Sequence, residues 1–160
     1  MQIVLDKQKA LLAYWERLRP EGRLPRKSDF DPIDIPPLLG DLLWVAVERQ
    51  PMRFRIHLYG SNVEELRGEN LTGAYVDEVT GEHIHERVLD SYRWVASEGK
   101  PFFDLIPHDV RHARVVDYHR LMLPFAEDGG TVDFILISFI AAPVEHGHLK
   151  HEVVRAFWKE

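Results

Sequence analysis

The stretch "LLWVAVER" at Leu42–Arg49 decides the fold, because as a strand it would be apolar on both of its faces. Such a strand needs cover on both sides and normally lies inside a sheet. The stretch "TVDFILISFIA" at Thr131–Ala141 also has apolar side chains at successive positions, and therefore on both faces. We predict that these two strands lie side by side at the centre of one sheet.

Hairpins add outer strands to this central pair. Gln50-Pro51 joins the first strand to the second, and Glu127–Gly130 forms the turn between the fourth and the fifth. The predicted fold is α+β, with a five-stranded antiparallel sheet in the order 2-1-5-4-3. The predicted strands, in chain order, are Leu42–Arg49, Met52–Tyr59, Pro101–Ile106, Val115–Leu123 and Thr131–Ala141.

Two amphipathic helices are available to cover this sheet. The helix Glu82–Glu98 has an apolar stripe at helical spacing and is ended by Gly99. The helix Ile3–Leu18 has a similar stripe and is ended by Pro20. We expect the Glu82–Glu98 helix to cover one face of the sheet. The other face needs the Ile3–Leu18 helix, a second subunit, or both.

Composition excludes several classes of function. The chain has 160 residues, of which 45% are hydrophobic and 29% charged, as expected for one globular domain. Its net charge of −6 argues against nucleic acid as the main partner. There is no cysteine, which removes disulfides, thiolate zinc sites and a cysteine-linked flavin. We see neither a signal peptide nor a membrane-spanning segment, and we expect a cytoplasmic protein.

The junction "YGSNVEELRG" at Tyr59–Gly68 raises the question of a phosphate-binding loop. Such a loop needs several glycines, usually with Lys-Ser or Lys-Thr at the helix start, whereas Gly60 stands alone and no lysine follows it. Ser61 and Glu64 match a capping box instead, and Gly68 can provide a left-handed helix end. We therefore predict a structural turn and no nucleotide site.

The order of elements and two sequence motifs resemble those of PAS domains. The stretch "NVEELRGENLTGAYVDEVTGE" is similar to the PAS pattern of Asn, Leu-x-Gly and a second Gly, carried here by Asn62, Leu66, Gly68, Leu71 and Gly73. The stretch "LPRKSDFDPIDIPPLLGDLLWV" resembles the segment before the first strand in a group of stand-alone bacterial PAS proteins. Leu24, Pro25, Lys27, Asp29, Asp31 and Pro32 carry that match.

The resemblance implies a bacterial sensory or protein-interaction module without catalytic activity. PAS domains have a pocket between the sheet and the long helix, and some hold haem, flavin or a small metabolite. The cofactor of this chain, if there is one, is unknown. The resemblance further implies a homodimer, a signalling protein as partner and a possible small-molecule ligand. We divide the chain into a helix with its linker (residues 1–23), a PAS-like domain (24–145) and a C-terminal tail (146–160).

Candidate site residues follow from the expected faces. Arg120 is ambiguous: if it faces inward it needs an anionic partner, such as a ligand carboxylate or phosphate. If it faces outward it is solvated, and Asp117 and His119 lie inside instead. We favour the outward orientation. Residues that could line a pocket are Trp44, Trp94, Phe102, Tyr118, Arg120 and Phe134. Residues that could form a dimer interface are Leu11, Tyr14, Trp15 and Leu18.

Two alternatives to a sensor remain. The first is a small enzyme in which an Asp/His pair from the segment Asp104–His119 performs acid–base chemistry. The second is an interaction adaptor with a filled core and no ligand. A basic stretch from Arg17 to Lys27 is read as a solvated loop, with an acidic partner surface as the alternative. The nine histidines lack the carboxylate or thiolate partners of a defined site, so we predict no metal centre.

Overall fold

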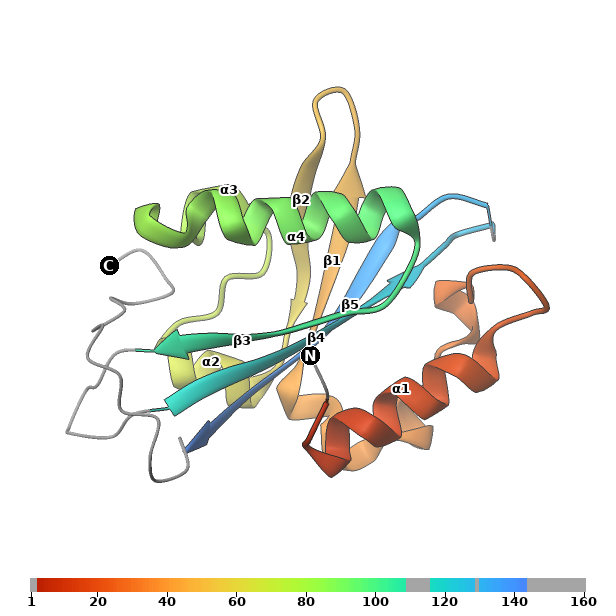
Figure 1. The fold of residues 1–160 in the computed structure, drawn as a ribbon, viewed down its shortest axis with the longest axis horizontal. Coiled ribbons are helices and arrows are strands. Elements are labelled where there is room, and N and C mark those ends of the chain that lie inside the picture. Colours follow the sequence, from red (N-terminus) through yellow and green to blue (C-terminus); the bar gives the residue numbers. More distant parts are fainter. Residues whose placement is uncertain (1–2, 109–115, 129, 144–160) are drawn as a thin grey trace.

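The first and last strands of the sheet lie side by side at its centre, as the sequence predicts (Figure 1). In the computed structural model, which describes residues 3–108, 116–128 and 130–143, β1 (Leu42–Glu48) pairs antiparallel with β5 (Phe134–Pro143). Every residue of β1 except Glu48 is buried. The two-sided apolar pattern therefore located the centre of the sheet correctly.

The remaining strands complete the predicted order β2-β1-β5-β4-β3. Each neighbouring pair is antiparallel, and a bulge between Trp44 and Val45 shifts the register of β1 against β2. The strand boundaries agree with the prediction to within about three residues at each end. The other strands are β2 (Arg53–Tyr59), β3 (Phe102–His108) and β4 (Val116–Phe125).

One face of the sheet is covered by α4 (His85–Glu98), which begins after the short η4 (Glu82–Ile84) (Figure 1). Gly99 ends α4 in the left-handed conformation, with φ of 62°, as predicted. The core between α4 and the sheet contains apolar side chains from all five strands and from α3 (Val76–Val79).

The opposite face is covered by α1 (Asp6–Leu18), which packs its apolar stripe on the chain's own sheet (Figure 1). Two buried side chains fix the helix in place. Trp15 Nε1 donates a hydrogen bond to Pro124 O at 2.8 Å, and Gln8 Nε2 donates to His119 O at 2.9 Å. This face is therefore covered within one chain, which answers the question that the sequence left open.

This packing corrects the predicted role of Leu11, Tyr14, Trp15 and Leu18 as a dimer interface. The first three are buried in the chain's own core, and Leu18 packs against the same cluster. Side chains that α1 already presses onto the sheet are not available for a second copy while the helix stays there.

Three short 3₁₀ helices connect α1 to β1: η1 (Lys27–Asp29), η2 (Pro32–Asp34) and η3 (Pro36–Asp41). Asp31 is the N-cap of η2, because its carboxylate accepts a hydrogen bond from Ile33 N at 2.9 Å. The prolines at the start of η2 and η3 keep these two helices to one or two turns. Among the described residues, no helix has both the length and the apolar character needed to cross a membrane.

Gly60 is required by a close approach of two backbone segments rather than by a ligand. A Cβ atom at this position would lie 2.4 Å from Gly40 O and 2.7 Å from Leu42 O. Gly60 N also donates to Leu42 O at 2.8 Å, so η3 and the start of α2 (Ser61–Arg67) are in direct backbone contact. Gly68 adopts the predicted left-handed conformation at the end of α2.

The predicted capping box at the start of α2 is wrong. The helix begins one residue earlier than the box requires, with Gly60 as N-cap and no side-chain capping bond. Asn62 instead donates to Asp41 Oδ1 at 2.7 Å, and Lys7 lies 3.2 Å from the other oxygen of this carboxylate. The buried Asp41 thus ties α1, η3 and α2 together.

Candidate functional site

The six residues predicted to line a pocket lie in separate places. Trp44 and Phe134 belong to the core under α1, whereas Tyr118 and Arg120 face α4. Trp94 contacts Phe102 where α4 meets β3, with ring centroids 5.7 Å apart, and is 41% exposed. The structure therefore does not bring the six together, because alternate positions on one strand point to opposite faces.

The aromatic side chains under α1 form a packed cluster. The Trp44 ring lies edge-on to Phe125 and Phe30, at centroid distances of 5.0 and 5.3 Å. Lys27 Nζ lies 4.3 Å from the centroid of the Phe134 ring, a cation–π contact. Among the predicted pocket residues, Trp44 and Phe134 thus have a structural role. Their partners Phe30 and Phe125 were not singled out from the sequence.

Arg120 is buried between α4 and the sheet, so the outward orientation that we favoured is wrong. Its side chain is 1% exposed. Its Nε and Nη2 donate to the two carboxylate oxygens of Asp104 at 2.9 and 2.8 Å, and Nη2 also donates to Ser91 Oγ at 2.8 Å. The anionic partner that an inward arginine needs is therefore a residue of the same chain.

This arrangement, which we call the Arg120 cluster, consists of Arg120, Asp104 and Ser91. Each residue comes from a different element, since Asp104 lies directly opposite Arg120 on β3 and Ser91 lies on α4. Asp104 was missed as the partner because the faces of the edge strand were uncertain. Asp104 alternates with Phe102 and Ile106 along the strand, and both of these apolar residues pack in the core under α4. This alternation is the sequence signal that places Asp104 on the same face.

One nitrogen of the buried guanidinium is left unsatisfied. Arg120 Nη1 has no hydrogen-bond partner among the residues that the structure describes. The rings of Tyr92 and Phe102 lie 5.8 and 6.0 Å from the Arg120 Cζ atom. Burial raises the pKa of Tyr92 to about 12, while the charge of Arg120 and a hydrogen-bonding interaction of the Tyr92 hydroxyl with this guanidinium act in the opposite direction. The cluster thus offers an unused donor in an apolar layer.

The Asp/His pair of the enzyme hypothesis is not assembled by the described residues. Asp104 faces α4, whereas His119, which directly precedes Arg120 on β4, lies on the α1 side with its ring 6.1 Å from Phe103. The sheet therefore separates them. The side chain of Asp117 lies outside the part of the chain that the structure describes. Asp109 and His112 lie outside the described residues, as do the tail histidines. In the described part of the chain, no group of three or more acidic or histidine side chains could hold a metal ion.

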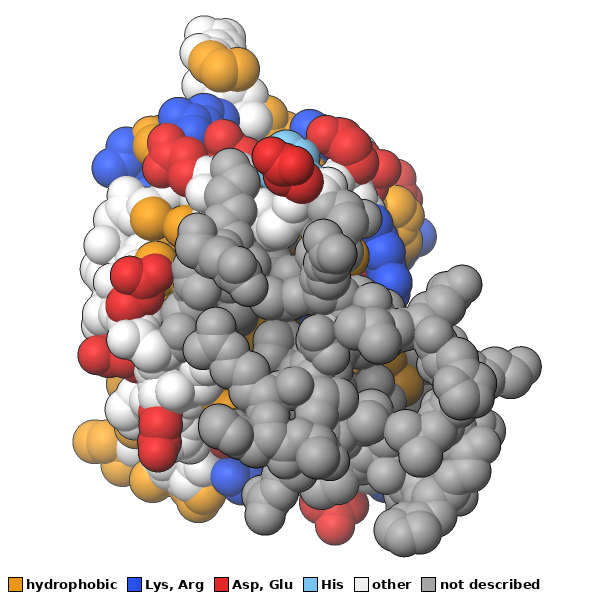
Figure 2. Space-filling model, turned by 90° about the vertical axis from the view of Figure 1, so that its left-hand side faces the viewer, with side chains coloured by type: hydrophobic (Ala, Val, Ile, Leu, Met, Phe, Trp, Pro, Cys, Tyr) orange, Lys and Arg blue, Asp and Glu red, His pale blue; other side chains and the backbone are white. Residues whose placement is uncertain are grey.

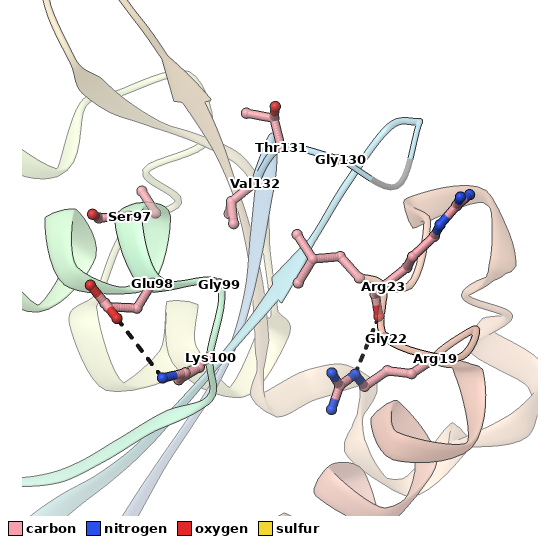
Figure 3. Close-up of a pocket in the computed structure, with 12 residues that line it drawn as sticks. Arg19, Gly22, Arg23, Ser97, Glu98, Gly99, Lys100, Gly130, Thr131 and Val132 are labelled. Atoms are coloured by element: carbon pink, nitrogen blue, oxygen red, sulfur yellow. Dashed lines mark hydrogen bonds and ion pairs between the residues drawn. The ribbon is translucent and has the colours of Figure 1, made fainter.

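A cleft of about 460 Å³ opens where the segment after α1 meets the end of α4 (Figure 3). Arg19, Arg23 and Leu24 form one wall, and residues 96–100 form another. Residues 130–132, between β4 and β5, complete the lining. None of the six predicted pocket residues lines this cleft, because its lining comes from loops and a helix end rather than from strand faces.

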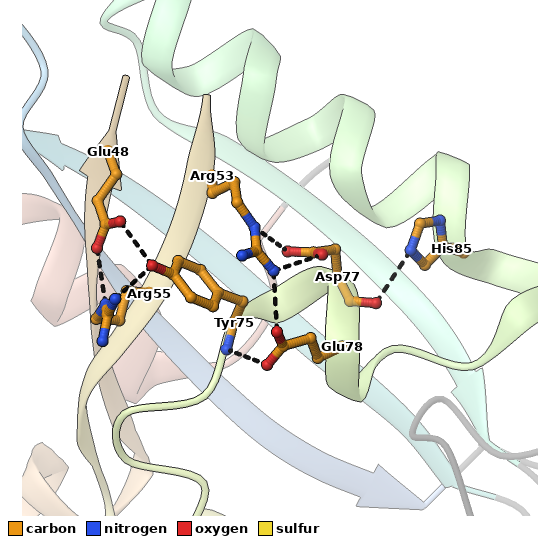
Figure 4. Close-up of polar contacts among 7 residues, drawn as sticks. All are labelled: Glu48, Arg53, Arg55, Tyr75, Asp77, Glu78 and His85. Carbon is orange, nitrogen blue, oxygen red and sulfur yellow. Dashed lines mark hydrogen bonds and ion pairs between the residues drawn. The ribbon is translucent and has the colours of Figure 1, made fainter. Parts of the chain in front are cut away.

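A charged network covers the part of β2 that lies away from α1 (Figure 4). The guanidinium of Arg53 stacks 3.5 Å from the centroid of the Tyr75 ring and forms an ion pair with Asp77 at 2.9 Å. Tyr75 and Arg55 both donate to Glu48, and these bonds hold the pKa of that carboxyl below its usual range.

The position of this network suggests a structural role. Figure 2 shows basic and acidic side chains next to one another at the base of the protruding β1–β2 hairpin. The network joins β2 to the segment that carries α3, and His85 Nε2 at the start of α4 donates to Asp77 O at 3.1 Å. It therefore holds α3 against the sheet edge with charges that are already paired.

Comparison with known families agrees with this fold. A sequence model of the PAS domain matches residues 5–139, and the chain belongs to the PAS domain family. No curated protein matches the chain. Among solved structures, the Rhodobacter sphaeroides LOV protein matches with a TM-score of 0.52 and 11% identity, covering 87% of this chain and 70% of that one.

A second solved structure, of a variant of RsLOV, matches with a TM-score of 0.48 and 13% identity over 68% of this chain. This chain covers 64% of the length of that one. At 11% identity the likeness to the Rhodobacter sphaeroides LOV protein shows the fold alone. The family match includes α1, in keeping with the packing of this helix on the sheet. The narrower likeness to stand-alone bacterial PAS proteins stays a prediction.

Proposed function

We propose that the protein is a non-catalytic regulatory PAS module of the bacterial cytoplasm that binds a small ligand at the Arg120 cluster. The observation that carries this proposal is the buried Arg120 Nη1, which lacks a hydrogen-bond partner among the described residues. Leaving a buried donor unsatisfied costs about 1–3 kcal/mol. A ligand that accepts a hydrogen bond from this nitrogen recovers that cost.

The charges of the cluster define the class of ligand. Asp104 already neutralises Arg120 through two short hydrogen bonds, so the site needs an acceptor and not a full negative charge. The neighbouring rings of Tyr92 and Phe102 favour an apolar or aromatic body. The proposed ligand is therefore a small neutral molecule with a carbonyl or hydroxyl acceptor.

The cluster also provides a route for a signal. Arg120 Nη2 donates to both Ser91 Oγ on α4 and Asp104 Oδ2 on β3. A ligand that moves this guanidinium therefore weakens the hydrogen bond between the sheet and α4. A shift of α4 alters the surface that a partner protein contacts. The Arg120 cluster would then couple occupancy to output.

Native mass spectrometry tests the ligand. Protein isolated from its own host is compared with the variants Arg120→Met and Arg87→Met, after thermal unfolding shows that each is folded. Arg87 is the matched control, because it lies 3.7 Å from Asp104 but is 56% exposed at the surface. We expect extra mass on the native protein and on Arg87→Met that is absent from Arg120→Met. A mass equal to the bare chain for all three proteins contradicts the proposal.

We also propose that the module forms a homodimer through a surface other than the apolar stripe of α1. Exposed apolar side chains outside that stripe support this, among them Ile33, Leu58 and Val4. Light scattering on the full chain tests the assembly. A monomer at all concentrations up to the millimolar range would rule it out, and would favour a separate signalling protein as the partner.

A further inference from the structure

The cleft of Figure 3 gathers cations that the sequence separates widely. Arg19 and Arg23 follow α1, whereas Lys100 follows α4 on the opposite wall, where its amino group points toward Glu98 (Figure 3). Glu98 supplies negative charge in the same lining, so the four residues together carry an excess of two positive charges. The chain as a whole has a net charge of −6. A cationic concavity on an acidic protein concentrates anions locally.

The Arg19 guanidinium lies 4.9 Å from the centroid of the Trp15 ring, and the polar contacts of the three cations are weak. Arg23 makes no hydrogen bond or ion pair through its side chain with the described residues. Arg19 uses Nε and Nη1 for contacts of 3.3 Å to Arg23 O and 3.4 Å to Glu16. Lys100 is 68% exposed and lies 3.9 Å from Glu98, a surface pair of little stability. A ligand carboxylate can therefore replace these contacts at low cost.

The rest of the lining suits a ligand with both acidic and aliphatic parts. Leu24, Ala96 and Val132 provide apolar surface, and Ser97 and Thr131 provide hydroxyl groups. The volume of about 460 Å³ falls within the range of ligand sites. Because the cations stand on two walls, several carboxylates must be presented together. Successive acidic side chains of one peptide meet that requirement.

We propose that this cleft binds an acidic peptide segment of a partner protein, with glutamate or aspartate carboxylates at Arg19, Arg23 and Lys100. The proposal adds a partner to the regulatory function and does not depend on the ligand of the Arg120 cluster. Loss of peptide binding therefore leaves the mass-spectrometry result unchanged, so the two proposals fail separately.

A titration by ¹H–¹⁵N NMR spectroscopy tests this site on the full chain. The probe is pentaglutamate with blocked ends, and pentaglutamine with the same blocks is the control peptide. We expect saturable shifts for the amides of Gly22, Gly99 and Thr131 with pentaglutamate alone, weakening as salt is added. Equal shifts with the two peptides would overturn the proposal. Displacement by glutarate at equal carboxylate concentration would overturn the peptide in favour of a small dicarboxylate.

Matched charge variants locate the contact. The double variant Arg23→Glu with Lys100→Glu is expected to raise the Kd for pentaglutamate at least about tenfold. The control variant Lys9→Glu with Arg93→Glu makes the same change in net charge on exposed helix positions outside the lining. We expect it to change the Kd by less than about threefold. An equal loss of binding in both variants shows that net charge alone attracts the peptide, and overturns the site.

Discussion

Breaking the ion pair of Arg120 with Asp104 should destabilise the protein far more than breaking a surface pair. Removing one partner of a buried pair costs about 3–5 kcal/mol, because the other charge stays buried and unpaired. Asp104→Leu leaves a guanidinium that is 1% exposed. Arg120→Met leaves a carboxylate that is 10% exposed and lies 3.7 Å from Arg87. We therefore expect Asp104→Leu to fall at the upper end of this range and Arg120→Met at the lower end.

The assay is urea unfolding of the two single variants and of the double variant, which together form a double-mutant cycle. For a domain of this size, about 3–5 kcal/mol corresponds to a fall in Tm of roughly 6–20 °C. The double variant should recover most of the loss, because no unpaired charge remains. Arg93 with Asp90 provides the control, a pair of 2.9 Å in which both side chains are exposed, and Arg93→Met should cost less than about 1 kcal/mol. Single variants that lose no more than this control would refute the reasoning.

Three more predictions concern the turn, the helix and a tyrosine. Gly60→Ala should cost about 1–3 kcal/mol in urea unfolding, because the new Cβ meets backbone at 2.4 Å, and a larger loss for Gly130→Ala, where the new Cβ lies 3.7 Å from Asp128 Oδ1, would contradict this. Trp15→Phe should cost about 1–3 kcal/mol, because it leaves the buried Pro124 O without its donor, and an unchanged Tm would show that this bond does not hold α1. Since the pKa of Tyr92 is raised to about 12, its stabilising contribution is complete below pH 10 and is lost as the pH rises toward 12. Tyr92→Phe should therefore reduce the loss of unfolding free energy above pH 10 by up to about 1.4 kcal/mol per pH unit. The same fall of unfolding free energy between pH 10 and 12 in both proteins would contradict this.

The order of the sheet could be predicted because it depends on which strands are apolar on both faces. β1 and β5 have this pattern, and burial of both faces admits no position but the interior of the sheet. Helix ends were also predictable where one residue decides the backbone, as Gly68 and Gly99 do.

The partner of Arg120 and the cover of the second face could not be predicted, because each depends on contacts between distant elements. β4 carries large side chains on both faces, so its sequence fits either orientation. A charged residue such as Arg120 is then expected to face solvent. The apolar stripe of α1 fits its own sheet and a second subunit equally well. What decides between them is hydrogen bonding to residues distant in the sequence, such as that of Gln8 and Trp15 with β4, and hydrophobic periodicity does not report such bonds.

The location of β5 has a consequence for synthesis on the ribosome. This strand lies between β1 and β4, so the nascent chain cannot complete the sheet until Pro143 has been translated and released from the exit tunnel. At about 5–20 residues per second, β1 waits roughly 5–20 s for its permanent neighbour. During that time its hydrophobic edge is open to aggregation, so chaperones that shield nascent strands should influence the yield of this protein more than that of a protein built from consecutive hairpins.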